Sequence, residues 1–382
     1  MHRVPLVVFS HLRWDFVYQR PQHLISRIAR HRPVLFVEEP EIRDGAAELK
    51  ITPAAPGVRV CRPQLDVGGP GFNALQQALI DPLLRAWLGH EGWNEFAVWL
   101  YTPMAARLAQ SLGPCAVLYD CMDELSAFLG APPELIERER DLMAWVDVVF
   151  TGGPSLYESK KDRHPFVRCF PSSVEVEHFA DPDVAEPADQ ASLVHPRFGY
   201  LGVVDERIDR DALDALAQAF PSASVIVVGP VVKIDPASLP RRANLHYLGG
   251  RPYAELPGYV RHWDLCTMPF VIGPATRYIS PTKVLEYMAA GRPIASTPIA
   301  DVVNPYGDIV HIGEGPEGFV AACRRALEQS DAEREARNDL AQQVLRRTSW
   351  DETARRMEGI LDAVVAAGRR RERTGFAAGA RA

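Results

Sequence analysis

The sequence has 382 residues, of which 47% are hydrophobic and 24% charged, so it can form two domains of ordinary size with substantial cores. A net charge of -7 argues against a nucleic-acid-binding protein, which usually carries a basic surplus. The six cysteines include no C-x-x-C pair, which argues against a zinc cage or a disulfide framework and favours reduced thiols in a cytoplasm.

The start of the chain shows no signal-peptide pattern, and no apolar run approaches the roughly 20 residues that cross a bilayer. We therefore expect a cytoplasmic protein, and peripheral contact with the inner face of the membrane is an open alternative. The last stretch, 368–382, combines Arg369, Arg370, Arg371 and Arg373 with Gly and Ala, and we expect a disordered basic tail there.

The first segments predict a βαβ unit and therefore a parallel sheet: a strand over Val4–Ser10, a helix over Gln22–Ala29 opened by Pro21, and a strand over Val34–Val37. The loop after the first strand lies at the sheet edge where such folds bind ligands. This loop and the start of the following helix hold a mixture of residues that packing alone rarely requires: His11, Arg13, Trp14, Asp15, Tyr18 and Arg20. We expect a binding role, with aromatics that fill a domain interface as the alternative.

The rest of the first half continues the alternation. The segment 44–70 looks irregular apart from a strand over Val58–Cys61, and 72–88 looks helical with a kink or break at Pro82. Strands follow at 96–100, 116–119, 146–150 and 167–170, and helices at 104–112 and 134–145. Several strands end in polar residues, among them Tyr101, Asp120 and Asp123, so we expect one crevice at this edge.

The second half repeats the pattern after a linker rich in Asp, Pro and Ala at 181–196. Strands are predicted at 198–201, 224–228, 245–248 and 265–268, with helices at 211–219, 253–261, 319–328, 331–345 and 350–367. Gly202 follows the first of these strands, where a glycine lets the backbone approach a phosphate closely. This succession predicts a second parallel sheet with its own ligand edge.

The stretch Thr276–Thr297 carries the strongest chemical signal. Ser280-Pro281 looks like a helix start, Gly291 ends the helix, and an apolar strand follows. A helix start suits an anion, Lys283 adds a charge beside it, and Glu286 at i+3 can accept hydrogen bonds from a vicinal diol. Phosphate on one side and sugar hydroxyls on the other indicate a nucleotide.

This stretch resembles the donor-site motif of GT-B glycosyltransferases, most closely the retaining family 4 type (glycosyl transferases group 1). The run EYMAAGRPI, 286–294, looks like the family run EAMAxGxPV, whose first glutamate grips the donor ribose. The family often has a second glutamate where this chain has Tyr278, and a subset with proline, lysine and glutamate matches Pro281, Lys283 and Glu286 better. The segment PSSVEVEHF, 171–179, resembles the family's segment at the end of the N-terminal domain.

The resemblance implies roles for several residues. For each of them the sequence itself also allows an alternative role. Arg207 would face the donor diphosphate, or pair with the neighbouring acids Asp205, Glu206 and Asp209. Arg251 in the turn after Gly249 would lie near the donor base, or belong to a plain turn. The expected donor site comprises Gly202, Arg207, Gly249, Arg251, Arg277, Ser280, Thr282, Lys283 and Glu286. In the first domain Tyr101 stands where the family often has a histidine, and Asp120 and Asp123 are candidate bases or helix caps.

We therefore expect an α/β protein of GT-B architecture, with two Rossmann-like βαβ domains facing each other across a cleft. Its parts would be an acceptor domain (1–180), a linker (181–196), a donor domain (197–349), a helix crossing back onto the first domain (350–367) and the tail (368–382). The expected activity is transfer of a hexose, with retention and without a metal or cofactor, from a UDP- or GDP-hexose to a hydroxyl of a glycan or lipid-linked acceptor, in cell-surface or exopolysaccharide synthesis.

Other functions fit the same architecture less well. A nucleotide-sugar epimerase and a non-catalytic nucleotide-sugar-binding partner stay open. A phosphorylase would need a segment with a pyridoxal-phosphate lysine, which the sequence does not resemble. A NAD-dependent dehydrogenase would need G-x-G-x-x-G after a first strand, and neither half has it.

Overall fold

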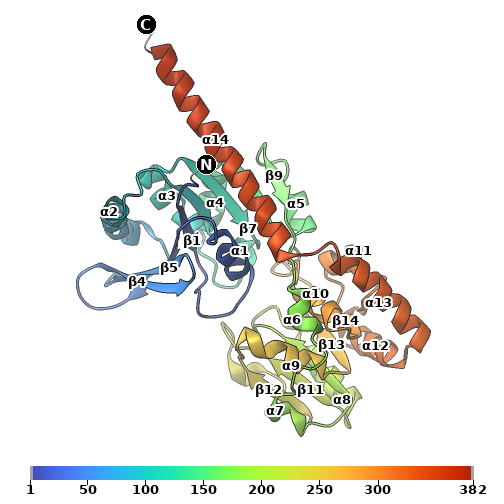
Figure 1. Ribbon diagram of the computed structural model, residues 1–382. Coiled ribbons are helices and arrows are strands. Elements are labelled where there is room, and N and C mark those ends of the chain that lie inside the picture. The colour runs from blue at the N-terminus through green and yellow to red at the C-terminus, as the bar shows by residue number, and fades with distance from the viewer. Residues whose placement is uncertain (1–2, 380–382) are drawn as a thin grey trace.

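The computed structural model describes residues 3–379, and of residues 369–379 only the helix. The chain forms two α/β domains, and its final helix returns to the first of them (Figure 1). Within the described residues the first domain holds a nine-stranded sheet and the second a six-stranded one. Both sheets are built from buried β-branched and aromatic runs, as expected for parallel strands covered by helices on both faces.

The first sheet has the strand order β3-β5-β2-β1-β6-β7-β8-β9, and β4 pairs with β5 in an antiparallel hairpin. The other pairings are parallel, with β1 in register between β2 and β6. The strands are β1 (Leu6–Ser10), β2 (Val34–Glu38), β3 (Glu41–Ile42), β4 (Glu48–Ala55), β5 (Val58–Leu65), β6 (Ala97–Leu100), β7 (Ala116–Cys121), β8 (Val148–Thr151) and β9 (Val167–Cys169).

The second sheet is parallel throughout, in the order β12-β11-β10-β13-β14-β15. Its order reverses between β10 and β13, which is the switch point where α/β sheets bind ligands. The strands are β10 (Arg197–Leu201), β11 (Ser224–Val228), β12 (Leu245–Gly249), β13 (Leu265–Met268), β14 (Ile294–Ser296) and β15 (His311–Ile312).

The helices of the first domain are α1 (Arg20–Ile28), α2 (Ala74–His90), η1 (Pro103–Ala105), α3 (Ala106–Leu112), η2 (Leu125–Ala127), α4 (Leu135–Trp145) and α5 (Pro154–Lys160). The connection carries α6 (Val176–Ala180) and α7 (Ala188–Ala191). The second domain has α8 (Arg210–Ala219), η3 (Pro236–Ser238), η4 (Tyr253–Glu255), α9 (Leu256–Arg261), α10 (Lys283–Ala289), α11 (Ala300–Tyr306), α12 (Gly315–Glu328) and α13 (Asp331–Leu345), and α14 (Trp350–Gly379) follows.

Helix α14 packs on α1 and β7 of the first domain, which confirms the predicted crossing (Figure 1). Trp350, Met357 and Leu361 are buried in that domain's core. Glu358 pairs with Arg3 and with Arg32 across the contact. The first domain is therefore built from two separate parts of the chain.

The structure continues α14 through the segment predicted as a disordered tail, as far as Gly379. That segment is rich in Ala and Arg, which are good helix formers and carry an existing helix onward. Residues 380–382 of the predicted tail lie outside the described residues.

Three local predictions differ from the structure. The segment 44–70 contains the β4–β5 hairpin, which turns at Gly57 with φ +77 and leaves β4 largely exposed. Helix α2 continues through Pro82 as one element, because Ile80 and Leu84 bury its face on both sides of the proline. Helix α10 begins at Lys283 rather than at Pro281, and the Thr282 side chain makes no capping bond.

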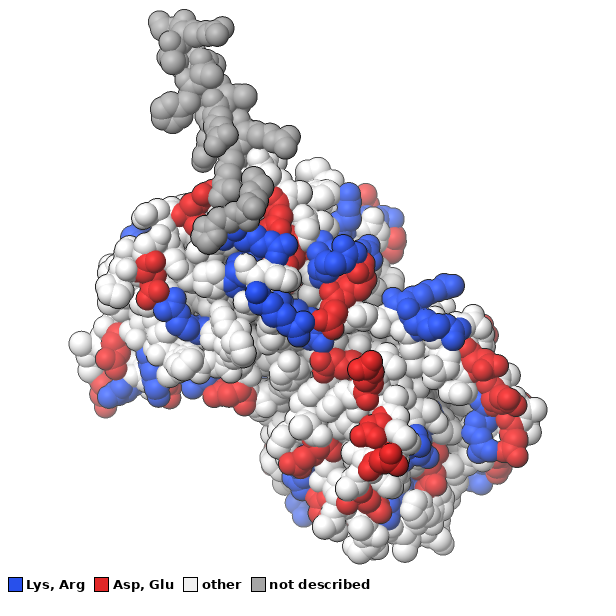
Figure 2. All heavy atoms as spheres, in the orientation of Figure 1, with Lys and Arg blue, Asp and Glu red and all other residues white. Residues whose placement is uncertain are grey.

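Two further features concern the surface. Acidic and basic side chains are interspersed over the face shown in Figure 2, so this face has no large area of a single charge. Among the described residues no helix combines the length and apolarity needed to cross a bilayer.

Candidate functional site

A cavity of about 120 Å³ lies between the two domains, where loops after strands of both sheets meet. The first domain contributes Gln19, Arg20, Met122, Asp123, Gly152 and Ser172, and the second Tyr200, Arg207, Phe270, Ile279, Ser280, Pro281, Thr282 and Lys283. We call this cavity the interdomain cleft. It brings Arg20, Asp123, Arg207, Ser280, Thr282 and Lys283 together from the residues predicted by the sequence.

Lys283 reaches the cleft from the first residue of α10 and lies over the Gly202 loop. Gly202 has φ +142, and a Cβ there would lie 2.0 Å from Cε of Lys283. Glycine at 202 therefore makes room for the lysine as well as for close backbone approach. Burial lowers the pKa of Lys283, and Glu286 opposes this effect. The ammonium forms no salt bridge among the described residues, and Nζ lies 5.9 Å from the centroid of the Tyr200 ring.

Glu286 lies one turn further along α10 and is 9% exposed. Burial raises its pKa to about 7, against the opposing effect of Lys283. Its carboxyl group makes no hydrogen bond within the part of the chain that the structure describes. A buried carboxyl group without a protein partner is costly and is characteristic of a ligand site.

Arg207 lines the cleft but is paired, as the sequence-based alternative had it. Its Nε and Nη2 donate to the Asp205 carboxylate, the shortest distance being 2.6 Å. Asp123 of the first domain lines the same cavity, and burial raises its pKa to about 6. An acidic group thus faces Arg207 and Lys283 across the cleft.

Asp120 and Tyr101 lie deeper in the first domain. Asp120 belongs to strand β7 and is fully buried, and Arg20 donates to both its oxygens, with Nη2 at 2.8 Å. Burial, and next Asp120, raise the pKa of Tyr101. The Arg20–Asp120 pair fixes α1 against β7, so Asp120 is engaged in the structure rather than open to the cleft.

The loop after β1 is tied to the end of β2. The buried carboxylate of Glu38 accepts from Arg13, from the Trp14 backbone amide and from Arg62. The Trp14 ring packs against Phe36 of the core. Asp15 is exposed and pairs with Arg62.

His11 lies at the start of this loop. Burial, and next Lys233 of the second domain, lower its pKa to about 4. Of the five predicted acceptor residues only Arg20 lines the cleft, together with its neighbour Gln19.

Five predicted donor residues are not part of the cleft lining: Gly202, Gly249, Arg251, Arg277 and Glu286. Arg251, after the Gly249 turn, donates hydrogen bonds to Asp189 of α7 and to the Tyr259 hydroxyl. Arg277 is exposed and its guanidinium lies over the ring of Tyr278. Ser280 does line the cleft, and its backbone carbonyl accepts a hydrogen bond from the Ser172 hydroxyl of the first domain.

Among the residues that join the domains around the cleft, the sequence singled out Tyr18, whose contact fits the alternative of an aromatic at the domain interface, and missed Asp301 and Phe128. Tyr18 stacks on Tyr253 with ring centroids 4.7 Å apart, and the Asp301 carboxylate accepts from the Ser155 amide at 3.0 Å. Phe128 lies near Arg207 and Lys233. Each contact joins residues that are far apart in the chain and carry no local motif.

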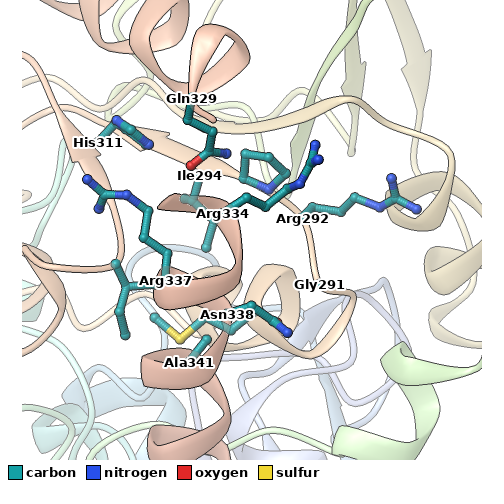
Figure 3. A pocket seen from close by; sticks show the side chains of 12 residues that line it. Gly291, Arg292, Ile294, His311, Gln329, Arg334, Arg337, Asn338 and Ala341 are labelled. Atoms are coloured by element: carbon teal, nitrogen blue, oxygen red, sulfur yellow. The ribbon is translucent and has the colours of Figure 1, made fainter. Parts of the chain in front are cut away.

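A second, smaller cavity of about 30 Å³ lies in the second domain, at the opposite end of β14 from the cleft. Figure 3 shows His311 and Arg337 on one side of it and Arg334 and Arg292 on the other. It contains no residue that the sequence assigned to the site. Within the described residues no group of three His, Cys, Asp or Glu side chains could hold a metal ion.

Comparisons with known proteins agree with this geometry. Residues 195–329, most of the second domain, match the family model of glycosyl transferases group 1. The chain is 24% identical over 258 residues to a putative teichuronic acid biosynthesis glycosyltransferase, TuaH, of Bacillus subtilis (strain 168), a match that covers 62% of this chain and 64% of the relative. The chain thus spans somewhat less than two thirds of that relative.

Solved structures extend the likeness to both domains. A sucrose-phosphate synthase from Thermosynechococcus elongatus has a TM-score of 0.72 at 15% identity, covering 96% of this chain and all (100%) of that one. A UDP-forming trehalose-phosphate synthase from Burkholderia xenovorans, in complex with glucose-6-phosphate, has a TM-score of 0.69 at 13% identity, covering 94% and 100%. The predicted GT-B fold is confirmed, and the predicted resemblance to glycosyl transferases group 1 is confirmed over residues 195–329.

Proposed function

We propose that the protein is a glycosyltransferase that takes a hexose from a nucleotide-sugar in the interdomain cleft to a hydroxyl group of a glycan or lipid-linked acceptor, in cell-surface polysaccharide synthesis. The match to glycosyl transferases group 1 and the teichuronic acid relative support this class of reaction. UDP is the first donor nucleotide to test, because a structural neighbour is named as UDP-forming.

The observation that carries the proposal is the pair of charged groups on α10, half-buried Lys283 and buried Glu286. The two groups interact electrostatically with each other, but neither forms a hydrogen bond or a salt bridge among the described residues. Lys283 lines the cleft between the two Rossmann-like domains, and Glu286 lies one turn further along α10. A diphosphate beside the lysine and ribose hydroxyls beside the glutamate would satisfy both groups.

In the transfer, the bond between the sugar C1 and the diphosphate oxygen breaks, and a bond between C1 and the acceptor hydroxyl oxygen forms. Lys283 and Nη1 of Arg207 stabilise the charge on the departing diphosphate, which needs no metal. The acceptor proton leaves to an oxygen of the departing phosphate or to Asp123. The acceptor hydroxyl approaches C1 from the face that the diphosphate leaves, so the configuration at C1 is retained.

The test is a donor screen followed by a transfer assay. UDP, GDP, ADP and dTDP, free and with their common sugars, are added to the protein with and without magnesium while its melting is followed. At one hundred times its dissociation constant a ligand stabilises by about 2.7 kcal/mol. We expect a shift with one nucleotide that is indifferent to magnesium and lost in Lys283→Met.

Arg334→Met is the matched control, because it removes one exposed arginine at the second cavity. Absence of a shift with every nucleotide would contradict the donor site. Donor binding with interconversion of the sugar would indicate an epimerase instead. Donor binding with neither transfer nor interconversion, over a panel of glycan and lipid-linked acceptors, would indicate a binding partner.

A further inference from the structure

Phe128 is an aromatic residue of the first domain that contacts two cations of the second. It follows η2, and its half-buried ring packs on the core of the first domain. Cζ of Arg207 and Nζ of Lys233 each lie 5.2 Å from the ring centroid. Both distances are within the range of cation–π attraction, so one ring joins the two domains beside the cleft.

The backbone next to Phe128 makes a second contact across the domains. The amide of Leu129 donates to Oε1 of Glu206 at 3.1 Å. The Leu129 side chain itself is 60% exposed. The 128–129 segment therefore holds the 205–207 loop on two sides, through a ring and through an amide.

The two cations come from loops that are joined to each other. The Val204 amide donates to the Pro230 carbonyl at 2.9 Å, and the Val232 amide donates to the Val204 carbonyl at 3.0 Å. Lys233 has φ +62, a left-handed conformation that is uncommon outside glycine and persists where its surroundings fix it. Arg207 and Lys233 thus form one unit that meets one ring.

Arg207 has one part of its guanidinium group available to a ligand. Asp205 accepts from Nε and Nη2. Nη1 makes no hydrogen bond within the part of the chain that the structure describes. Asp205 fixes one edge of the guanidinium group and Phe128 lies against it, so Nη1 is the nitrogen of Arg207 that has no acceptor among the described residues.

We propose that Phe128 is a positioning residue, whose ring holds the Arg207 guanidinium in place for the departing diphosphate when the two domains are closed. This inference rests on the proposed function. Phe128 itself touches no reacting atom. Its contribution depends on the aromatic ring, so an aliphatic residue of similar size should not replace it, whereas another aromatic residue should.

The experiment compares Phe128→Leu, Phe128→Tyr and Leu129→Ala with the wild-type protein in steady-state kinetics with the donor found above. We expect Phe128→Leu to lower kcat about tenfold, equivalent to about 1.4 kcal/mol, while the donor KM changes less than threefold. Phe128→Tyr should retain most of the activity. Leu129→Ala is the control, because it keeps the backbone contact and removes only an exposed side chain.

Melting temperatures separate positioning from a merely structural role. A structural role would lower the melting temperature of Phe128→Leu and leave kcat per folded molecule unchanged, which would overturn the proposal. Wild-type kcat in Phe128→Leu would overturn it as well, and so would an equal loss in Phe128→Tyr.

A second measurement keeps this inference distinct from the proposed function. Small-angle scattering of the unliganded protein reports the separation of the domains whether or not it transfers a sugar. If the wild-type protein bound and transferred no donor, the proposed function would be contradicted. The role of Phe128 in positioning Arg207 at the diphosphate would be contradicted with it. The cross-domain contact would then be supported by a larger radius of gyration in Phe128→Leu, and refuted by an unchanged one.

Discussion

The loops at the ligand edges of the two sheets use their charged residues in opposite ways. In the first domain Arg13 and Arg62 bind Glu38, and Arg20 binds Asp120, so these five charges have protein partners. In the second domain half-buried Lys283 and buried Glu286 form no hydrogen bond or salt bridge among the described residues, although their charges influence each other. Position at a sheet edge therefore does not mark a ligand site by itself, whereas a buried charge without a partner does.

The largest effect should come from breaking the Arg20–Asp120 salt bridge of the first domain. Arg20→Met leaves the fully buried carboxylate of Asp120 without its partner, which should cost about 3–5 kcal/mol of unfolding free energy. The measurement is urea denaturation at neutral pH. Arg20→Met combined with Asp120→Asn should recover part of the loss, and full stability of the single variant would contradict the pairing.

Substitution of Lys283 in the second domain should have the opposite result, with a loss of donor affinity and no loss of stability. Lys283→Met removes an ammonium group that has no protein partner, so the melting temperature should stay constant or rise. Binding of the donor should weaken tenfold or more, because a charged hydrogen bond contributes about 1.5–3 kcal/mol. Calorimetric titration of the nucleotide measures this, and an unchanged affinity together with a large loss of stability would make Lys283 structural.

The pH dependence of Glu286 sharpens the contrast. Burial raises its pKa from 4.5 to about 7, so the folded chain keeps a proton that the unfolded chain loses as the pH rises through this window. Stability should therefore fall between about pH 4.5 and 7, by up to about 3 kcal/mol at about 1.4 kcal/mol per unit. Glu286→Gln should be free of this loss.

Donor binding supplies the second readout for Glu286. Because the carboxylate form is the better acceptor from ribose hydroxyls, affinity should rise from pH 6 to 8 in the wild-type protein and stay flat in Glu286→Gln. A wild-type affinity that is also flat over this range would separate Glu286 from the donor.

The loop after β1 gives a smaller effect that tests its predicted acceptor role. Arg13→Met removes one of three donors to Glu38 and should cost about 1–2 kcal/mol of stability. The acceptor KM should be unchanged, since the side chain is committed to Glu38. Asp15→Asn, at an exposed position, is the control, and a rise in acceptor KM without loss of stability would support acceptor binding.

The smallest effect is expected at Arg251. Its guanidinium pairs with Asp189, and both side chains are about one-third exposed (27% and 36%). Arg251→Met should therefore change stability by at most about 1 kcal/mol and donor KM less than threefold. A larger rise in donor KM would place the residue at the donor base, as the resemblance implied.

The predictable part of this molecule is local in sequence. Apolar runs such as 224–228 and the alternation of strands and helices carry the parallel sheets, and Lys283 and Glu286 lie on one short helix. The pairing of Arg207 with Asp205, two residues away, was also open to prediction as an alternative. These features depend on neighbours within a few residues, which a single sequence displays.

The unpredictable part depends on partners far apart in the chain. Arg20 meets Asp120 across 100 residues, and Phe128 meets Lys233 across the two domains. The type of residue does not reveal such a partner, so Arg13 and Asp120 looked as available as Lys283. The β4 strand was missed because its exposed, proline-containing sequence lacks the apolar signal of a buried strand.

The return of α14 to the first domain has a consequence for synthesis on the ribosome. The last strand of that domain ends at Cys169, whereas Trp350, Met357 and Leu361, which complete its core, are translated about 180 residues later. At about 5–20 residues per second this delay is roughly 10–40 s. During that time the growing chain exposes the apolar surface that α14 covers, so the first domain to be made is the last to be finished.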